Sequence, residues 1–182
     1  MTYSAIALFI ALAAWFAFLP ANEPKIASMP NAIAPQNTAP APNTPYTSSA
    51  SYTTYRAPDG TFSFQYPPDF TATSFDEGES TIVLIQKNGA GAQIAISPFD
   101  EDIVLTAERI EKDLPDLVMV SPRSATLQSD TRVRGVLFNS VDESGLGTRE
   151  YWFVYRGNVY QIKVFAKDAE LLEKITATWE FQ

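Results

Sequence analysis

The stretch from Thr148 to Ala166 constrains the fold of this chain more than any other. It reads TREYWFVYRGNVYQIKVFA, two runs rich in β-formers on either side of Gly157-Asn158. Both turn residues tolerate the positive φ that a two-residue hairpin turn needs, so we predict two long antiparallel strands. If Arg156 and Val159 flank the turn, the cross-strand pairs on one face are apolar or aromatic throughout: Tyr155 with Tyr160, Phe153 with Ile162, and Tyr151 with Val164. The rest of the domain must cover this face.

The opposite face of the predicted hairpin is mixed in character. Its pairs are Trp152 with Lys163, Val154 with Gln161, and Glu150 with Phe165. An uncovered tryptophan and phenylalanine beside polar side chains would suit contact with another protein. The candidate partner surface is therefore Trp152, Val154, Gln161, Lys163 and Phe165, and the alternative is that a helix packs on this face.

The first residues of the chain are strongly apolar. Ala5–Leu19 is a run of 15 apolar residues, and no charged side chain precedes Glu23. Because a membrane-spanning helix needs ~17–25 apolar residues and a signal-peptide core ~7–15, the run lies between the two. We predict an uncleaved transmembrane anchor over residues 3–20, with a cleaved signal peptide and a buried core helix as alternatives.

A change in composition separates this apolar run from the remainder. Residues 21–51 are rich in Pro, Ala, Ser, Thr and Asn and poor in large apolar side chains. Such a segment cannot bury enough apolar surface to offset its chain entropy, so we predict a disordered linker. Residues 52–182 then form the globular domain, which is long enough to bury a core of its own.

Residues 52–182 alternate between strand and helix patterns. Thr106 is expected to cap one helix and Asp168 another, and Thr81–Gln86, apolar on both faces, is expected to lie centrally in a sheet. The predicted elements before the hairpin are strands over 62–66, 70–75, 81–86, 92–97, 125–128 and 132–141 and a helix over 106–114; a second helix follows the hairpin from residue 168. Short connections between successive strands predict an α+β fold, with a mostly antiparallel sheet flanked by helices.

The charge and the missing residue types exclude several functions. The chain has 13 basic and 21 acidic side chains, a formal net charge of −8, and neither histidine nor cysteine. The negative charge argues against a nucleic-acid partner. The usual general base at neutral pH and the thiolate metal ligands are missing. We predict no catalytic residue, no cofactor and no metal site, and we interpret the acidic runs 76–79 and 100–102 as solvated turns.

The first strand of the domain carries a family likeness. The run Gly60–Pro67, GTFSFQYP, resembles the G-x-F-S-F-x-Y-P start of PsbP-like domains. The aromatic strand pair, acidic-capped helix and Thr178–Phe181 ending are also similar to that group. The resemblance covers about residues 52–182 and implies an αβα sandwich with an antiparallel sheet. It also implies an exported or lipid-anchored protein that acts as a binding or assembly module.

These observations together predict a membrane-tethered, non-enzymatic binding or assembly domain with a protein partner. The expected location is the cell membrane, with a single pass and the domain outside the cytoplasm; the alternative is a secreted or periplasmic protein after signal cleavage. Two other functions stay open at this point. One is a small-ligand sensor or carrier with a pocket between sheet and helix, and the other is a carboxylate-dependent hydrolase.

Overall fold

The computed structural model describes residues 51–142 and 145–182. The predicted anchor over residues 3–20 and the linker up to residue 50 lie outside the described residues. Within the two described ranges, no helix is long and apolar enough to cross a membrane.

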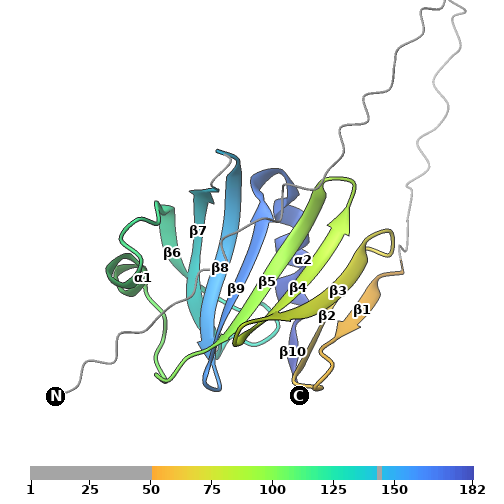
Figure 1. Cartoon of the computed structure of the whole chain (residues 1–182), viewed down its shortest axis with the longest axis horizontal. Helices are drawn as coiled ribbons and strands as arrows, with labels where there is room; N and C mark the ends of the chain where they lie inside the picture. The colour runs from red at the N-terminus through yellow and green to blue at the C-terminus, as the bar shows by residue number, and fades with distance from the viewer. Residues whose placement is uncertain (1–50, 143–144) are drawn as a thin grey trace, which may run out of the picture. The chain divides into compact units, whose positions relative to one another are not determined.

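Ten strands and two short α-helices make up the described part of the chain (Figure 1). Seven strands form one sheet in the order β3 (Thr71–Glu77), β4 (Ser80–Lys87), β5 (Ala90–Pro98), β9 (Asn158–Phe165), β8 (Gly147–Tyr155), β7 (Arg134–Val141) and β6 (Val120–Thr126). A small second sheet has the order β1 (Thr53–Arg56), β2 (Phe62–Tyr66), β10 (Glu180–Phe181). Every strand pair is antiparallel, which confirms the predicted α+β class.

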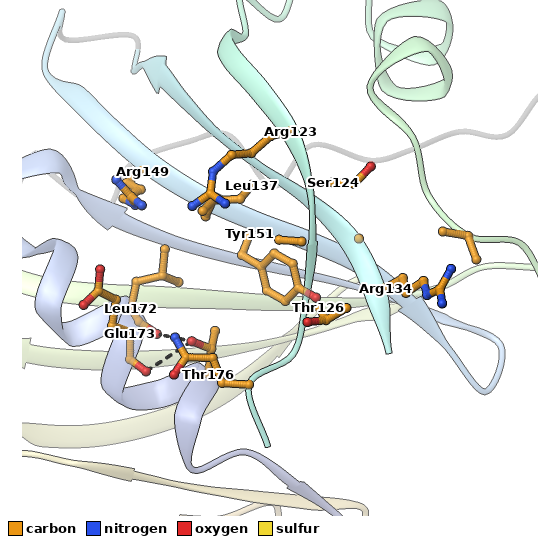
Figure 2. Close-up of a pocket in the computed structure, with 14 residues that line it drawn as sticks. Arg123, Ser124, Thr126, Arg134, Leu137, Arg149, Tyr151, Leu172, Glu173 and Thr176 are labelled. Atoms are coloured by element: carbon orange, nitrogen blue, oxygen red, sulfur yellow. Dashed lines mark hydrogen bonds between the residues drawn. The ribbon is translucent and has the colours of Figure 1, made fainter. Parts of the chain in front are cut away.

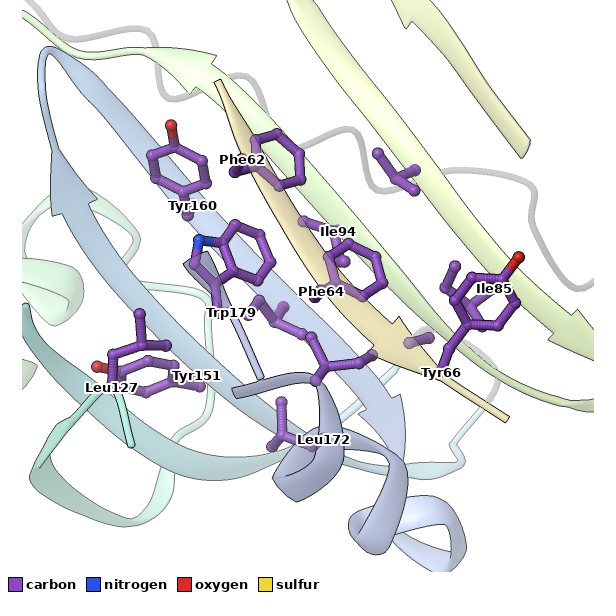
Figure 3. Packing of buried hydrophobic residues seen from close by; sticks show 14 of the residues in the cluster. Phe62, Phe64, Tyr66, Ile85, Ile94, Leu127, Tyr151, Tyr160, Leu172 and Trp179 are labelled. Carbon is purple, nitrogen blue, oxygen red and sulfur yellow. The ribbon is translucent and has the colours of Figure 1, made fainter. Parts of the chain in front are cut away.

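One face of the seven-stranded sheet carries the larger core. The helix α2 (Ala169–Ala177), which follows the 3-10 turn η1 (Ala166–Asp168), packs on β9, β8 and β5 and against β2. Trp179 follows the C-terminal end of α2 and stacks on Phe62 and Phe64 (Figure 3). The centroid of its ring lies 4.7 Å from that of Phe62 and 5.3 Å from that of Phe64. The aromatic residues of the small sheet and Trp179 therefore supply the cover that the hairpin's aromatic face requires.

The other face of the sheet carries a second, smaller core. The segment after β5, including helix α1 (Ala107–Asp113), packs over part of β7, β8 and β9. The buried members of this core are Phe99, Leu105, Ile110, Leu114, Val136, Phe138, Trp152, Val154 and Val159. Both faces of the hairpin are thus covered at least in part, and by different segments.

The hairpin register differs from the predicted one by two residues. Phe153 lies opposite Tyr160 and Tyr151 opposite Ile162, so the two turn residues are Arg156 and Gly157, with φ of 47° and 75°. The prediction that Gly157-Asn158 forms the turn is therefore wrong. Arg156, and not Asn158, has the left-handed backbone conformation beside Gly157. Since a shift of two keeps each side chain on its face, the two faces are those that the sequence predicts.

Of the two predicted N-caps, the one on α1 is present and the one on α2 is not. Thr106 caps α1 as predicted, its Oγ1 accepting a hydrogen bond from the backbone N–H of Arg109 at 3.2 Å. Asp168 makes no side-chain cap on α2, so that prediction is wrong. Its carboxylate instead accepts the N–H of Gly91 at 3.3 Å, which ties the start of the helix to β5.

Four strands lie elsewhere than predicted or were not predicted. Thr81–Gln86 lies in an inner strand, but β4 is next to the edge strand β3, and β9 occupies the centre. The strand predicted over 125–128 begins at Val120 instead. The short strands β1 and β10 are additions that pair with β2 on its two edges.

Candidate functional site

A pocket of about 630 Å³ lies between α2 and the strands β6, β7 and β8 (Figure 2). We call it the arginine pocket. Its lining residues are Val104, Arg123, Ser124, Ala125, Thr126, Gln128, Arg134, Gly135, Leu137, Arg149, Tyr151, Leu172, Glu173 and Thr176. A pocket between sheet and helix is the feature that the alternative function of a small-ligand carrier requires, and its volume is in the usual range for small-molecule sites.

The sheet register explains where this pocket forms. Arg123, Leu137 and Tyr151 lie side by side across β6, β7 and β8, and Ala125 lies beside Gly135 in a neighbouring row. Neither Ala125 nor Gly135 places a large side chain above the sheet at this point. Because α2 packs on β9, β8 and β5 rather than over β6 and β7, space remains beside the helix on this face.

Three arginines give the pocket a positive charge. Arg123 and Arg149 extend from β6 and β8 toward the same end of the pocket (Figure 2). Arg134 lines the other end, but it alternates with Gly135 on β7 and so points from the sheet face that carries Val136 and the second core. Among residues 51–142 and 145–182, no carboxylate lies within ion-pairing distance of any of the three. With Glu173 as the single acid among the lining residues, three arginines leave an excess of two positive charges.

Two of the four arginines elsewhere in the domain are ion-paired. Arg109 contacts Glu101 at 2.7 Å and Asp113 at 2.5 Å. Arg132 contacts Asp130 at 2.7 Å, and its hydrogen bond lowers the pKa of that aspartate to about 2. Arg156 donates to the backbone carbonyl of Gln182 at 2.9 Å, and Arg56 has no ion pair among the described residues. What distinguishes the pocket arginines is therefore that they line one cavity of an acidic chain.

Two buried polar atoms in the pocket residues have no hydrogen-bond partner. They are the Tyr151 hydroxyl and the Nε of Arg149, within the part of the chain that the structure describes. Tyr151 is only 2% exposed, and burial raises the pKa of its phenol, so the hydroxyl stays protonated and able to donate. Because a buried donor without a partner costs ~1–3 kcal/mol, a bound acceptor would stabilise this arrangement.

The predicted partner surface is split by the fold. Trp152 and Val154 belong to the second core, and the indole Nε1 of Trp152 donates to the buried carboxylate of Glu150 at 2.9 Å. Gln161 and Lys163 are part-exposed, and Phe165 is buried. A binding role for this face stays a prediction.

A Trp152→Ala variant that keeps its fold but no longer captures a membrane partner would support it, and unchanged capture would count against it.

The acidic runs have structural partners nearby. Glu101 accepts two hydrogen bonds from the Arg109 guanidinium, and Asp76 accepts one from the hydroxyl of Thr81. Within residues 51–142 and 145–182, no group of three or more acidic side chains is placed to hold a metal ion.

Sequence reasoning missed the pocket arginines. A weak signal was available, since Arg123, Arg132 and Arg134 fall within twelve residues of an otherwise acidic chain. That signal does not separate Arg132, which pairs with Asp130, from the two that line the pocket. Arg149 lies farther along the chain and joins them only through the pairing of β7 with β8.

The comparisons with known proteins identify the fold. No protein-family model matches this chain, and no curated protein matches it. Among solved structures it is similar to the cyanobacterial PsbP (CyanoP) of Synechocystis sp. PCC 6803, with 12% identity, a TM-score of 0.53, and coverage of 78% of this chain and 98% of that one. A crystal structure from Bacteroides thetaiotaomicron VPI-5482 aligns at 13% identity and a TM-score of 0.43, over 71% of this chain and 48% of that one. The fold is PsbP-like, as the resemblance in the sequence predicted.

Proposed function

We propose that this chain is a non-enzymatic binding domain whose arginine pocket holds an anionic group. The observation that carries the proposal is that Arg123 and Arg149 line one cavity beside the buried hydroxyl of Tyr151, and that among the described residues neither arginine has an ion pair and the hydroxyl has no hydrogen-bond partner. A guanidinium presents its donors in a planar fork that matches a carboxylate or a phosphate. The occupant in this proposal is therefore a carboxylate or phosphate group.

A function in binding rather than in catalysis agrees with the composition. The sequence has no histidine and no cysteine, so the commonest general base and the strongly nucleophilic thiolate are both missing. The PsbP-like fold fits the same proposal, since the resemblance implies a binding or assembly module. A small-ligand carrier and a domain that binds an acidic partner would use the pocket in the same way.

Replacing Arg149 with methionine is expected to weaken anion binding by about 10-fold or more, because a charge-assisted hydrogen bond contributes ~1.5–3 kcal/mol. The measurement is thermal unfolding of the full chain with increasing glutarate or inorganic phosphate, against chloride at equal ionic strength. A ligand at ten times its Kd stabilises the native state by about 1.4 kcal/mol, which is a shift of several degrees in Tm.

Arg132→Gln is the matched control, since it removes the same charge from an arginine that is paired outside the pocket. It should leave the anion-dependent rise in Tm unchanged. If neither anion stabilises the wild-type chain, or if both variants respond as the wild type does, the pocket does not bind anions and the proposal fails.

We also propose that the chain is tethered to a membrane by Ala5–Leu19, with the domain outside the cytoplasm. The support is the length and apolar character of that run and the Pro-rich composition after it. The full chain should stay with membranes after an alkaline carbonate wash, and a variant lacking residues 5–19 should not.

The side of the membrane is testable because the chain contains no cysteine. A Lys112→Cys variant places one thiol on the exposed surface of α1. A membrane-impermeant maleimide should label it in intact cells that express the full chain. Label only after lysis would reverse the proposed orientation, and a shorter protein released from membranes would favour the secreted alternative.

A further inference from the structure

The outer edge of β6 ends the seven-stranded sheet beside the arginine pocket. In the part of the chain that the structure describes, β6 pairs with β7 on one side and with no strand on the other. Six of its seven residues are exposed. An unpaired strand edge presents backbone N–H and C=O groups that can pair with another extended chain.

The start of β6 is protected against such pairing, but its second half is not. Ser121 has a φ of 53°, Pro122 has no N–H to donate, and the register with β7 shifts between Val120 and Arg123. From Arg123 to Thr126 the pairing with β7 is regular. Helix α1 also contacts β6, so the edge open to another chain is at most the short segment Arg123–Thr126.

The same four residues line the arginine pocket. A chain laid along this edge would direct alternate side chains onto the face that holds the pocket, about 7 Å apart. On that face they would meet the guanidinium groups of Arg123 and Arg149, which have no carboxylate within ion-pairing distance among the described residues. Acidic side chains at alternate positions would complement both the charge and the spacing.

The other edge of the sheet has the opposite charge. The edge strand β3 contains Asp76 and Glu77 and no basic residue. An acidic chain would be repelled at β3 and attracted at β6, so charge directs it to one edge of the two.

Resting on the proposed function, we propose that the occupant of the arginine pocket is an acidic, extended segment of a partner protein. The segment adds a strand to the free edge of Arg123–Thr126 and places a carboxylate in the pocket. Backbone pairing with β6 supplies affinity, and the alternation of acidic side chains supplies specificity.

The test uses the full chain in a neutral detergent and three probes. The first is a capped hexapeptide of alternating glutamate and valine. The second is the same peptide N-methylated on alternate amides, which keeps the charge but cannot complete a strand ladder. The third is glutarate, a free dicarboxylate. Binding is followed by calorimetry and by hydrogen exchange of the amides of residues 123–126.

We expect the unmodified hexapeptide to bind at least ten times more tightly than glutarate or the N-methylated peptide, and to slow exchange in β6. Arg123→Gln, a change at an exposed position, should weaken its binding by about 10-fold or more. Arg132→Gln should change nothing, since Arg132 already pairs with Asp130.

Four results would overturn the inference. Equal affinity for all three probes with unchanged exchange in β6 would leave anion binding intact but exclude strand addition. Self-association of the wild-type chain that the peptide cannot displace would assign the β6 edge to a second copy. Binding of phosphatidylglycerol vesicles through Arg123, without binding of the peptide, would assign it to a lipid surface. The fourth is no binding of any of the three probes; if inorganic phosphate also fails to raise the Tm of the wild-type chain, the proposed function fails with the inference.

Discussion

Replacing Gly135 with alanine is expected to lower the free energy of unfolding by about 3 kcal/mol or more. A Cβ at this position would lie 2.0 Å from the carbonyl oxygen of Trp152 and 2.7 Å from the Cβ of Phe153. Both atoms belong to β8, which is fixed by its pairing on two sides, so neither can move aside easily. The contact between β7 and β8 would have to open, beneath the arginine pocket that Gly135 lines.

Urea denaturation of the full chain, followed by circular dichroism, measures this loss. The matched control is Gly147→Ala on β8, where a new Cβ would meet only the Ala166 Cβ at an ordinary 3.7 Å. Its cost should stay within ~0.5 kcal/mol. Equal losses in the two variants would mean that glycine-to-alanine changes in this sheet act through the backbone in general, and not through the close approach at Gly135.

Trp179→Ala is expected to cost ~3–5 kcal/mol of unfolding free energy, since it empties a large site in the main core. The indole is 1% exposed, stacks on Phe62 and Phe64, and meets the edges of Phe153 and Tyr160. It therefore joins the small sheet to the large one. Losing it should also loosen α2, which provides Leu172 and Thr176 to the pocket.

The same denaturation experiment measures the effect of Trp179→Ala, with Phe75→Ala as the control. Phe75 is also aromatic, but it is 48% exposed and lies on the edge strand β3. Its removal should cost less than about 1 kcal/mol. If the two variants lose the same amount, the stacked cluster around Trp179 is not a main source of stability.

The hairpin illustrates how far a local pattern can predict a fold. Alternation of apolar side chains correctly predicted which residues share a face, because a strand has a period of two and the pattern extends over many residues. The predicted register was wrong because two overlapping dipeptides, Arg156-Gly157 and Gly157-Asn158, can each form a two-residue turn. Alternation does not distinguish them, since a shift of two residues preserves both faces.

The helix that follows the hairpin shows a second kind of limit. An aspartate before an amphipathic run is a good capping signal, yet Asp168 bonds the N–H of Gly91, far away in the sequence. The competing donor is supplied by β5, and no local signal could reveal it. Thr106 meets no such competitor, and its predicted cap is present.

By itself the sequence determined the element types, the antiparallel class and the PsbP-like fold, because periodicity, turn residues and the G-x-F-S-F-x-Y-P run are local signals. Only the tertiary structure decided which side chains meet. Arg123 and Arg149 line the same pocket because β6, β7 and β8 pair side by side, because the register shifts near the start of β6, and because α2 packs on one part of the sheet. Each of these depends on contacts between distant segments, so charge patterns along the chain could not locate the pocket.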